Sequence, residues 1–335
     1  MEKEERLSWS KLYDVALKIQ ALKPWESMYN SDLICLLLPG HETPVYCSIM
    51  GIAGECIGIA MYYDLEAQIG FQKQLSTEMT YPSMLDYNKC FVCYWGARDE
   101  ISNKDYTLIK ELGFKFRGKT SWIYFRHMEP PYCPSELTPD DVDFVFDIMS
   151  NLYMALGAYL TGALHVDFEH GQMLVRSYDD DSKLWYNQSA DLMFPEIKYP
   201  TAAIRDNLLI VRLKKMKKSN ITIEADIANT GQAVSEKKGG RAYFYRIIII
   251  AAHDAGLVIS FDDVSVNDDE IDLFLRNIIG FIESNGRPRQ IIARERYAAL
   301  LDDLCSKLDI ELVVDEHPDV IEDFIQTMLN GGPMF

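Results

Sequence analysis

The chain has 335 residues, of which 48% are hydrophobic and 25% are charged, the composition of a globular protein with room for two or three domains. Its formal net charge of −18 argues against general nucleic-acid binding, because an acidic surface repels phosphate. No apolar run approaches the ~18 residues of a membrane span, and the acidic N-terminal segment lacks the apolar core of a signal peptide, so we expect a cytoplasmic protein.

The cysteines predict neither a disulfide framework nor a zinc site. The seven cysteines are odd in number and irregularly spaced, and Cys35, Cys47 and Cys56 fall inside strand-like runs. Cys90 and Cys93 form a C-x-x-C pair, but alternation along a strand would turn the two thiols to opposite faces. We therefore expect buried free thiols in a reducing compartment, and no metal or cofactor held by cysteine.

Residues 1–135 predict an α+β domain. Apolar residues at helical spacing indicate a helix over Leu7–Leu22, which ends before Pro24. Turn sequences separate the runs that follow, and the predicted order from about residue 25 to 130 is β-β-β-α-β-α-β-β. The predicted segments are the strands Leu33–Leu38, Val45–Gly51, Glu55–Tyr63 and Cys90–Trp95, the helices Asp64–Leu75 and Asp99–Leu112, and two extended segments within Phe114–Met128.

Residues 136–190 predict a helix followed by a polar connector. Thr138 and Pro139 begin a helix with two acids in its first turn, where the helix dipole favours them, and it extends to about Leu160. The Asp-rich segment 161–190 is weakly patterned, and we expect it to carry one or two edge strands.

Residues 191–335 predict a second, mixed-sheet α/β domain around a hairpin. Four consecutive isoleucines, the turn His253-Asp254-Ala255-Gly256 and a second apolar run indicate two paired strands buried on both faces. Gly256 would take a positive φ, and Asp254 would form the turn and not a catalytic pair. The predicted order from Ile221 is β-β-β-α-β-α-β-α, with strands at Ile221–Ile227, Tyr243–Ala252, Leu257–Val266, Arg287–Ala293 and Ile310–Val314, helices that begin near Asp268, Glu295 and Pro318, and one preceding strand at Leu208–Leu213.

This order of elements, with the D-x-G turn of the hairpin, resembles the ribonuclease-H-like fold of integrases and transposases. The resemblance implies carboxylates on the first strand, just after the fourth strand and on a late helix, which together hold two divalent metals for phosphoryl transfer. The matching residues of this chain are Asp226, Glu295 and either Glu322 or Asp323, with Glu270 as an auxiliary acid.

The same acids also have ordinary structural explanations. Asp226 alternates with apolar residues on a strand that this pattern predicts to be half-solvated, Glu295 begins a helix, and Asp323 lies on an amphipathic helix. The sequence contains no nucleophile elbow, Walker phosphate loop or zinc-protease motif. Mg²⁺ or Mn²⁺ would be required only if Asp226, Glu295 and Asp323 are catalytic.

A second resemblance spans nearly the whole chain. It rests on Trp25-Glu26, Tyr46–Gly51, Leu112-Gly113-Phe114, Phe116-Arg117-Gly118 with Trp122, Phe125-Arg126, Gly286-Arg287-Pro288 and Leu300-Leu301. These segments resemble an uncharacterised bacterial family of domains of unknown function. The resemblance implies a cytoplasmic bacterial protein with an N-terminal α+β unit joined to a C-terminal unit, but no activity or site. The family often has W-x-x-D ahead of the hairpin, whereas this chain has Ile223-Glu224-Ala225-Asp226.

Basic and aromatic residues alternate near the end of the first domain, at Arg117, Lys119, Trp122 and Arg126. Such a surface could bind an anion, a peptide or a nucleic-acid strand by stacking and bidentate contacts. Alternatively, the aromatic residues pack the sheet while Arg117 and Arg126 pair with the chain's own carboxylates.

We predict a non-catalytic binding or protein-interaction module that requires no cofactor. Its expected partner is a protein or a small anionic ligand, and we expect no general nucleic-acid binding and no membrane association. The alternative is metal-dependent phosphoryl transfer or nucleic-acid hydrolysis at Asp226, Glu295 and Asp323.

Overall fold

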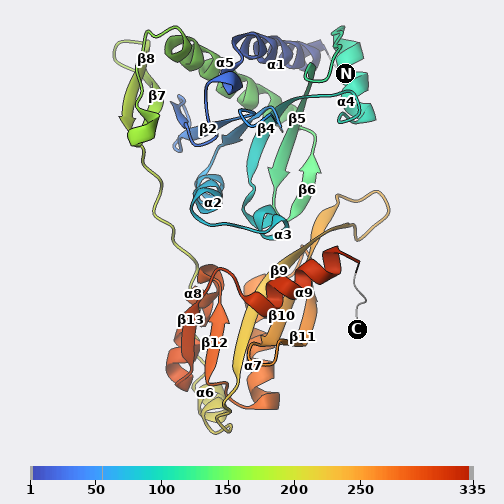
Figure 1. Cartoon of the computed structure of the whole chain (residues 1–335), viewed down its shortest axis with the longest axis vertical. Helices are drawn as coiled ribbons and strands as arrows, with labels where there is room; N and C mark the ends of the chain where they lie inside the picture. Colours follow the sequence, from blue (N-terminus) through green and yellow to red (C-terminus); the bar gives the residue numbers. More distant parts are fainter. Residues whose placement is uncertain (1–2, 55, 332–335) are drawn as a thin grey trace. The chain divides into compact units, whose positions relative to one another are not determined.

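The computed structural model describes residues 3–54 and 56–331, and the chain divides into two compact units (Figure 1). Unit 1 contains Met1–Ser76, Tyr87–Glu129 and Pro134–Pro195, and unit 2 contains Thr77–Asp86, Pro130–Cys133 and Glu196–Phe335. In the part of the chain that is described, each helix is too short or too polar to span a bilayer.

Unit 1 contains a mixed sheet in the strand order β5-β4-β3-β2-β1-β7-β8. Neighbouring strands are antiparallel except β1 and β7, which are parallel. The predicted meander of the first three strands is confirmed, although Glu55 of the third predicted strand lies outside the described residues. The elements are α1 (Lys3–Leu22), β1 (Ile34–Leu37), β2 (Val45–Met50), β3 (Gly58–Tyr62), α2 (Leu65–Ser76), β4 (Cys90–Gly96), α4 (Asn103–Leu112), β5 (Trp122–Glu129), α5 (Pro139–Leu160), β7 (Gln172–Asp179) and β8 (Leu184–Asp191), with 3-10 turns at Pro24–Glu26 and Phe168–His170.

Helices cover both faces of the unit 1 sheet. Helices α1, α4 and α5 pack on one face, and α2 packs on the other. Cys93 lies in the first of these cores and Cys90 in the second, so the two thiols of the C-x-x-C pair point to opposite faces as predicted. The cysteines are free, and Cys35 and Cys47 are buried as predicted, but Cys56 is exposed before β3, which corrects the prediction for that residue. Burial raises the pKa of the Cys35 thiol to about 12.

Residues 136–190, predicted to be a helix and a connector, instead complete unit 1. The helix begins at a capping box in which Thr138 and Asp141 exchange hydrogen bonds, and it packs as α5 against α1. The segment after it forms a hairpin, and its first strand, β7, lies inside the sheet between β1 and β8. The sequence does not reveal that this strand is internal. It lies in a polar segment, and its partner β8, at the edge of the sheet, is mostly exposed.

Unit 2 contains a sheet in the order β13-β12-β9-β10-β11. Strands β9, β10 and β11 are antiparallel to one another, whereas β12 and β13 are parallel to β9. The elements are α3 (Tyr81–Met84), α6 (Asn207–Lys214), β9 (Thr222–Val234), β10 (Tyr243–Ala252), β11 (Leu257–Val264), α7 (Glu270–Asn285), β12 (Gln290–Ala293), α8 (Glu295–Leu308), β13 (Glu311–Val314) and α9 (Asp319–Leu329). A 3-10 turn at Leu85–Tyr87 and strand β6 (Tyr132–Ser135) each contain residues of both units.

The order β-β-β-α-β-α-β-α of unit 2 confirms the predicted mixed α/β, ribonuclease-H-like arrangement. The predicted strand Leu208–Leu213 is wrong, because this segment is helix α6. The Asp206 carboxylate accepts hydrogen bonds from the amides of Leu208 and Leu209 and so caps the helix. A run of branched apolar residues is compatible with a buried helix face as well as with a strand, and the Asp206 cap favours the helix.

The two faces of the unit 2 sheet carry different helices. Helices α6, α7 and α8 pack on the face formed by Ile223 and Ile227 of β9 and Ile248 of β10. Helix α9 crosses the opposite face, where Ile321 packs against Ile249 (Figure 1). The hairpin turn between β10 and β11 has Gly256 at φ 64°, as predicted.

Candidate functional site

The polar face of β9 is buried, which corrects the prediction of a half-solvated strand. Thr222, Glu224 and Asp226 are at most 1% exposed, although they alternate with apolar residues. Their side chains point toward the face that α9 and α3 cover. Alternation alone cannot reveal that a helix from the end of the chain lies over the polar face.

Glu224 caps helix α9 from the neighbouring strand. Its carboxylate accepts hydrogen bonds from the amides of Val320 (3.3 Å) and Ile321 (3.0 Å), and it lies 2.6 Å from Nδ1 of His253. The residue before the helix, Pro318, supplies no side-chain cap. Glu224 therefore satisfies helix amides that would otherwise be buried without a partner.

We expect the start of α9 to become less protected as pH rises through the pKa of His253. The hydrogen bond with Glu224 raises this pKa above its usual 6.5 against the opposing effect of burial, and the charges of Asp254 and Asp319 act in the same direction as Glu224. Because the pKa of His253 is higher in the folded than in the unfolded protein, its contact with Glu224 stabilises the start of α9 fully below the unfolded-state pKa. This stabilisation is lost as pH rises through the folded-state pKa. His253 is more than one-third exposed, so the effect should not exceed about 1 kcal/mol.

Hydrogen exchange of the Val320 and Ile321 amides, corrected for intrinsic rates, measures this dependence. The substitution His253→Gln should abolish it. The substitution His170→Gln changes an exposed histidine of unit 1 and should leave it intact. An unchanged pH dependence in His253→Gln would refute the assignment.

Asp226, the first predicted catalytic residue, faces an arginine. Arg294 follows β12 and is 6% exposed, and its Nη1 lies 3.2 Å from Oδ2 of Asp226. Its Nη2 donates to Glu322 Oε1 at 3.2 Å, and its Nε donates to the carbonyl of Glu316 at 3.1 Å. The guanidinium, which follows the fourth strand, thus joins the first strand, the segment after the fifth strand and the last helix of unit 2.

Burial dominates the electrostatics of Asp226. Burial raises the pKa of its carboxyl, while the positive charges of Arg294 and Arg296 lower it and the charge of Asp86 raises it. The backbone amide of Ile227 also lowers this pKa. The contact of Oδ2 with Arg294 is an ion pair without hydrogen-bond geometry. The site favours the neutral form of Asp226 more than water does.

Further charged residues extend this arrangement into an ionic cluster. Glu270 accepts a hydrogen bond from Arg246 at 2.7 Å and lies 3.5 Å from Arg296. Asp86 accepts a hydrogen bond from Asn229, and burial raises its pKa against the charge of Arg296. We define the ionic cluster by its three arginines and four acids, Arg246, Arg294, Arg296, Asp86, Asp226, Glu270 and Glu322.

The residues present do not fit a divalent metal site. Asp226 is fully buried, whereas Glu295 and Asp323 are exposed. Among the residues that the structure describes, no group of three or more His, Cys, Asp or Glu side chains is placed to hold a metal ion. The structure brings Glu322 instead of Asp323 toward Asp226, and it places the cation of Arg294 between these two carboxylates. In the sequence, the only sign of a cation at this position is Arg294, directly before Glu295.

The predicted binding surface of unit 1 is only partly exposed. Arg126 donates two hydrogen bonds, of 3.0 and 2.7 Å, to the buried carboxylate of Asp105. Burial raises the pKa of Asp105, but the hydrogen bonds and charge of Arg126 outweigh it, so the pKa lies below its usual value. Trp122 packs against Phe116, with ring centroids 6.0 Å apart. Arg117 and Lys119 lie exposed in the loop before β5.

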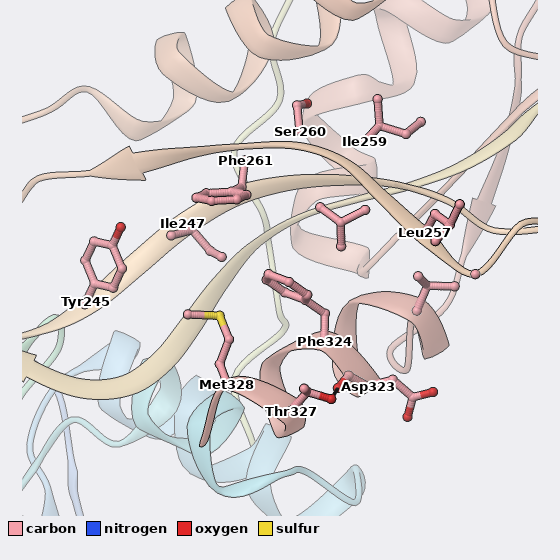
Figure 2. A pocket seen from close by; sticks show the side chains of 13 residues that line it. Tyr245, Ile247, Leu257, Ile259, Ser260, Phe261, Asp323, Phe324, Thr327 and Met328 are labelled. Atoms are coloured by element: carbon pink, nitrogen blue, oxygen red, sulfur yellow. Dashed lines mark hydrogen bonds between the residues drawn. The ribbon is translucent and has the colours of Figure 1, made fainter. Parts of the chain in front are cut away.

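An apolar groove of about 750 Å³ lies between the β10–β11 hairpin and α9. Leu257 and Phe261 of β11 and Phe324 and Met328 of α9 line it, and Figure 2 shows Phe261 and Phe324 on opposite walls. The centroids of these two rings are 6.3 Å apart. Asp323, the third predicted catalytic residue, also lines this groove.

The exposure of β11 corrects the prediction that both hairpin strands are buried. The second half of β10 is buried, but Leu257 is 64% and Phe261 is 50% exposed. Within the described residues, β11 pairs only with β10, so it forms the edge of the unit 2 sheet. Sequence reasoning missed the groove because an apolar edge strand has the same composition as a buried one.

Comparisons with known proteins give domains without assigned function. Among curated proteins, none matches the chain. Among solved structures, the HTLV-2 integrase catalytic core domain in complex with magnesium has 15% identity and a TM-score of 0.23, over 36% of this chain and 79% of that one. The simian T-cell lymphotropic virus intasome in complex with PP2A regulatory subunit B56 gamma has 17% identity and a TM-score of 0.23, over 41% of this chain and 43% of that one.

Similarity at this level carries no argument about the fold, so the fold assignment of unit 2 rests on its own strand order and directions.

Two family models match the sequence. Residues 209–329 match a domain of unknown function, DUF6930. Residues 9–176 match another domain of unknown function, DUF7309. Since this second match spans just over half of the chain, the protein belongs to the DUF7309 family.

Proposed function

We propose that this protein is a non-catalytic binding module that holds a segment of a partner protein in the groove between β11 and α9. The observation that carries the proposal is the concave apolar surface, in which large side chains such as Leu257 and Phe261 are exposed beside Phe324. Contiguous apolar surface that is concave and exposed is typical of sites that bind another molecule. Asp323 on the groove wall favours a protein segment over a small anionic ligand.

The ionic cluster supports the non-catalytic part of the proposal. The position at which a ribonuclease-H-like enzyme would gather carboxylates around metal ions holds the guanidinium of Arg294. A cation at that position repels divalent metals and neutralises the acids that would bind them. The proposed function therefore requires no cofactor, and the free cysteines support a reducing, cytoplasmic compartment for it.

Peptide display against the 335-residue chain tests this proposal. We expect selection to enrich peptides whose affinity falls by about tenfold or more in Phe261→Ser, because aromatic side chains at the centre of an interface contribute most of its binding energy. Fluorescence anisotropy with the enriched peptides measures the loss.

The matched control is Leu208→Ser, which removes an apolar side chain that is 83% exposed on α6 and does not line the groove. This substitution should leave every affinity unchanged. Failure to enrich any peptide, or equal affinity for wild type and Phe261→Ser, would refute the proposal.

A further inference from the structure

We infer that the partner segment is an amphipathic helix of about three turns, with lysine or arginine beside its apolar face, that lies alongside α9. This inference rests on the proposed function and specifies the ligand of the same groove. It follows from the layer geometry of unit 2, from the irregular edge of β11 and from the charge on the groove walls.

The layer geometry leaves room for one more helix. A helix packed on a sheet is about 10 Å wide and strands are about 4.8 Å apart, so one helix covers about two strands. Helix α9 packs on β9 and β10 and leaves Phe261 of β11 half-exposed on the same face. The opposite face has α6, α7 and α8. A second helix beside α9 would bury Phe261 together with the free flank of Phe324 and Met328.

The length of the expected ligand follows from α9. This helix has 11 residues, which corresponds to ~16 Å at the usual rise per residue. A ligand helix that runs along it would therefore need about three turns, with apolar residues at intervals of three and four.

The edge of β11 is unsuitable for a ligand strand. The pairing register with β10 shifts between Ile250 and Ala251, and Ile259 has no partner on β10. Such a bulge disrupts the regular backbone pattern that an added strand needs. Asp262 and Asp263 are exposed on the same strand, and charged edge residues are a usual protection against strand addition.

The acidic residues in and beside the groove select a basic partner. Asp323 lines the groove from α9. Asp263 pairs with Ile247 and therefore shares the face that carries α9, and it accepts a hydrogen bond from Tyr245, which lines the groove. A second copy of the chain would bring its own α9, whose exposed acids include Asp319 and Asp323, against these two aspartates. An anionic membrane would be repelled in the same way. Basic residues beside the apolar face of the ligand match the site.

Three synthetic peptides of twelve residues test the inference, each labelled for fluorescence anisotropy at 0.15 M salt. The first has leucines at helical spacing with lysine at the other positions. The second has the same leucines with glutamate at the other positions. The third has the composition of the first, but its leucines alternate with lysines in the pattern of a strand. Circular dichroism measures the helix content of each peptide when it is free and when it is bound.

We expect the first peptide to bind, to gain helix content on binding and to lose affinity in Phe261→Ser. The charge-reversed variant with Asp263→Lys and Asp323→Lys should bind it about tenfold more weakly and should now bind the glutamate peptide. The control with Asp180→Lys and Asp181→Lys makes the same change in net charge on an exposed turn of unit 1, and it should leave the affinity unchanged.

Each other outcome contradicts the inference in a recognisable way. Stronger binding of the alternating peptide would indicate strand addition, and equal weakening in the control variant would indicate unspecific attraction to an acidic protein. A dimer in sedimentation that Phe261→Ser dissociates would identify a second copy as the ligand. If the displayed peptides that bind the groove have neither basic residues nor apolar residues at helical spacing, the inference fails while the proposed function stands.

Discussion

Replacing Arg294 with methionine is expected to lower the free energy of unfolding of unit 2 by about 3–5 kcal/mol, because it leaves the buried carboxyl of Asp226 and the partly buried carboxylate of Glu322 without their cation. Arg294 is 6% exposed and lies 3.2 Å from both Asp226 and Glu322. Methionine keeps much of the volume of the side chain, so the loss would report charge and hydrogen bonding more than a cavity. A loss of this size is a large fraction of the stability of a typical domain.

The measurement must report unit 2 alone. All five tryptophans, at positions 9, 25, 95, 122 and 185, lie in unit 1, so intrinsic fluorescence follows that unit. Hydrogen exchange in peptides that contain β9 and β12, measured against denaturant concentration, gives the unfolding free energy of unit 2.

The matched control is Arg276→Met on α7. Arg276 forms an ion pair with Asp272 but its side chain is 73% exposed, and such a surface pair contributes at most about 1 kcal/mol. If the two substitutions cost the same, the ionic cluster does not stabilise unit 2 as described.

The hairpin and the cap signals show what the sequence predicts well. The order of elements in unit 2 follows from alternating helical and strand periods, and the hairpin turn follows from Gly256, which adopts the expected positive φ. The capping box at Thr138 likewise marks the start of α5. These features depend on neighbours within a few residues, and local sequence contains that information.

The candidate site depends on contacts between distant parts of the chain. Arg294 meets Asp226 across 68 positions, and Glu322 reaches Arg294 from 28 positions further on. The sequence places three acids on the expected elements, but helix periodicity does not determine whether Glu322 or Asp323 turns toward β9. The structure turns Glu322 to the cluster and Asp323 to the groove. One helical step of about 100° separates these two outcomes.

The groove was hidden for a related reason. Burial of a strand depends on how many helices cover its sheet, and that number is a property of the whole unit. The apolar run of β11 predicts a buried strand, yet α9 covers only part of it, through contacts such as Phe324 with Phe261, and Leu257 stays exposed.

The substitution Asp226→Asn is expected to raise the free energy of unfolding of unit 2 at neutral pH, and to remove part of its pH dependence. Burial raises the pKa of the Asp226 carboxyl in the folded protein, despite the opposing charges of Arg294 and Arg296. A group with a raised folded-state pKa contributes its full stability below the unfolded-state pKa and loses that contribution as pH rises through the folded-state pKa. Asparagine resembles the neutral carboxyl, which the site favours, and it cannot ionise.

A double-mutant cycle with Arg294→Met separates the two effects. In wild type, the charge of Arg294 lowers the pKa of the buried Asp226 carboxyl. Arg294→Met alone should therefore become more destabilising as pH rises, because the stranded carboxyl must either ionise without its cation or keep a proton. In the Asp226→Asn background, the same arginine substitution should cost less, with a coupling energy of about 0.5–3 kcal/mol. Hydrogen exchange of β9 at several pH values measures all four proteins. A coupling near zero, or a wild type whose pH dependence equals that of Asp226→Asn, would mean that Asp226 does not ionise beside Arg294. The stability of unit 2 would then rest on Glu322 and the carbonyl of Glu316 as the partners of the guanidinium.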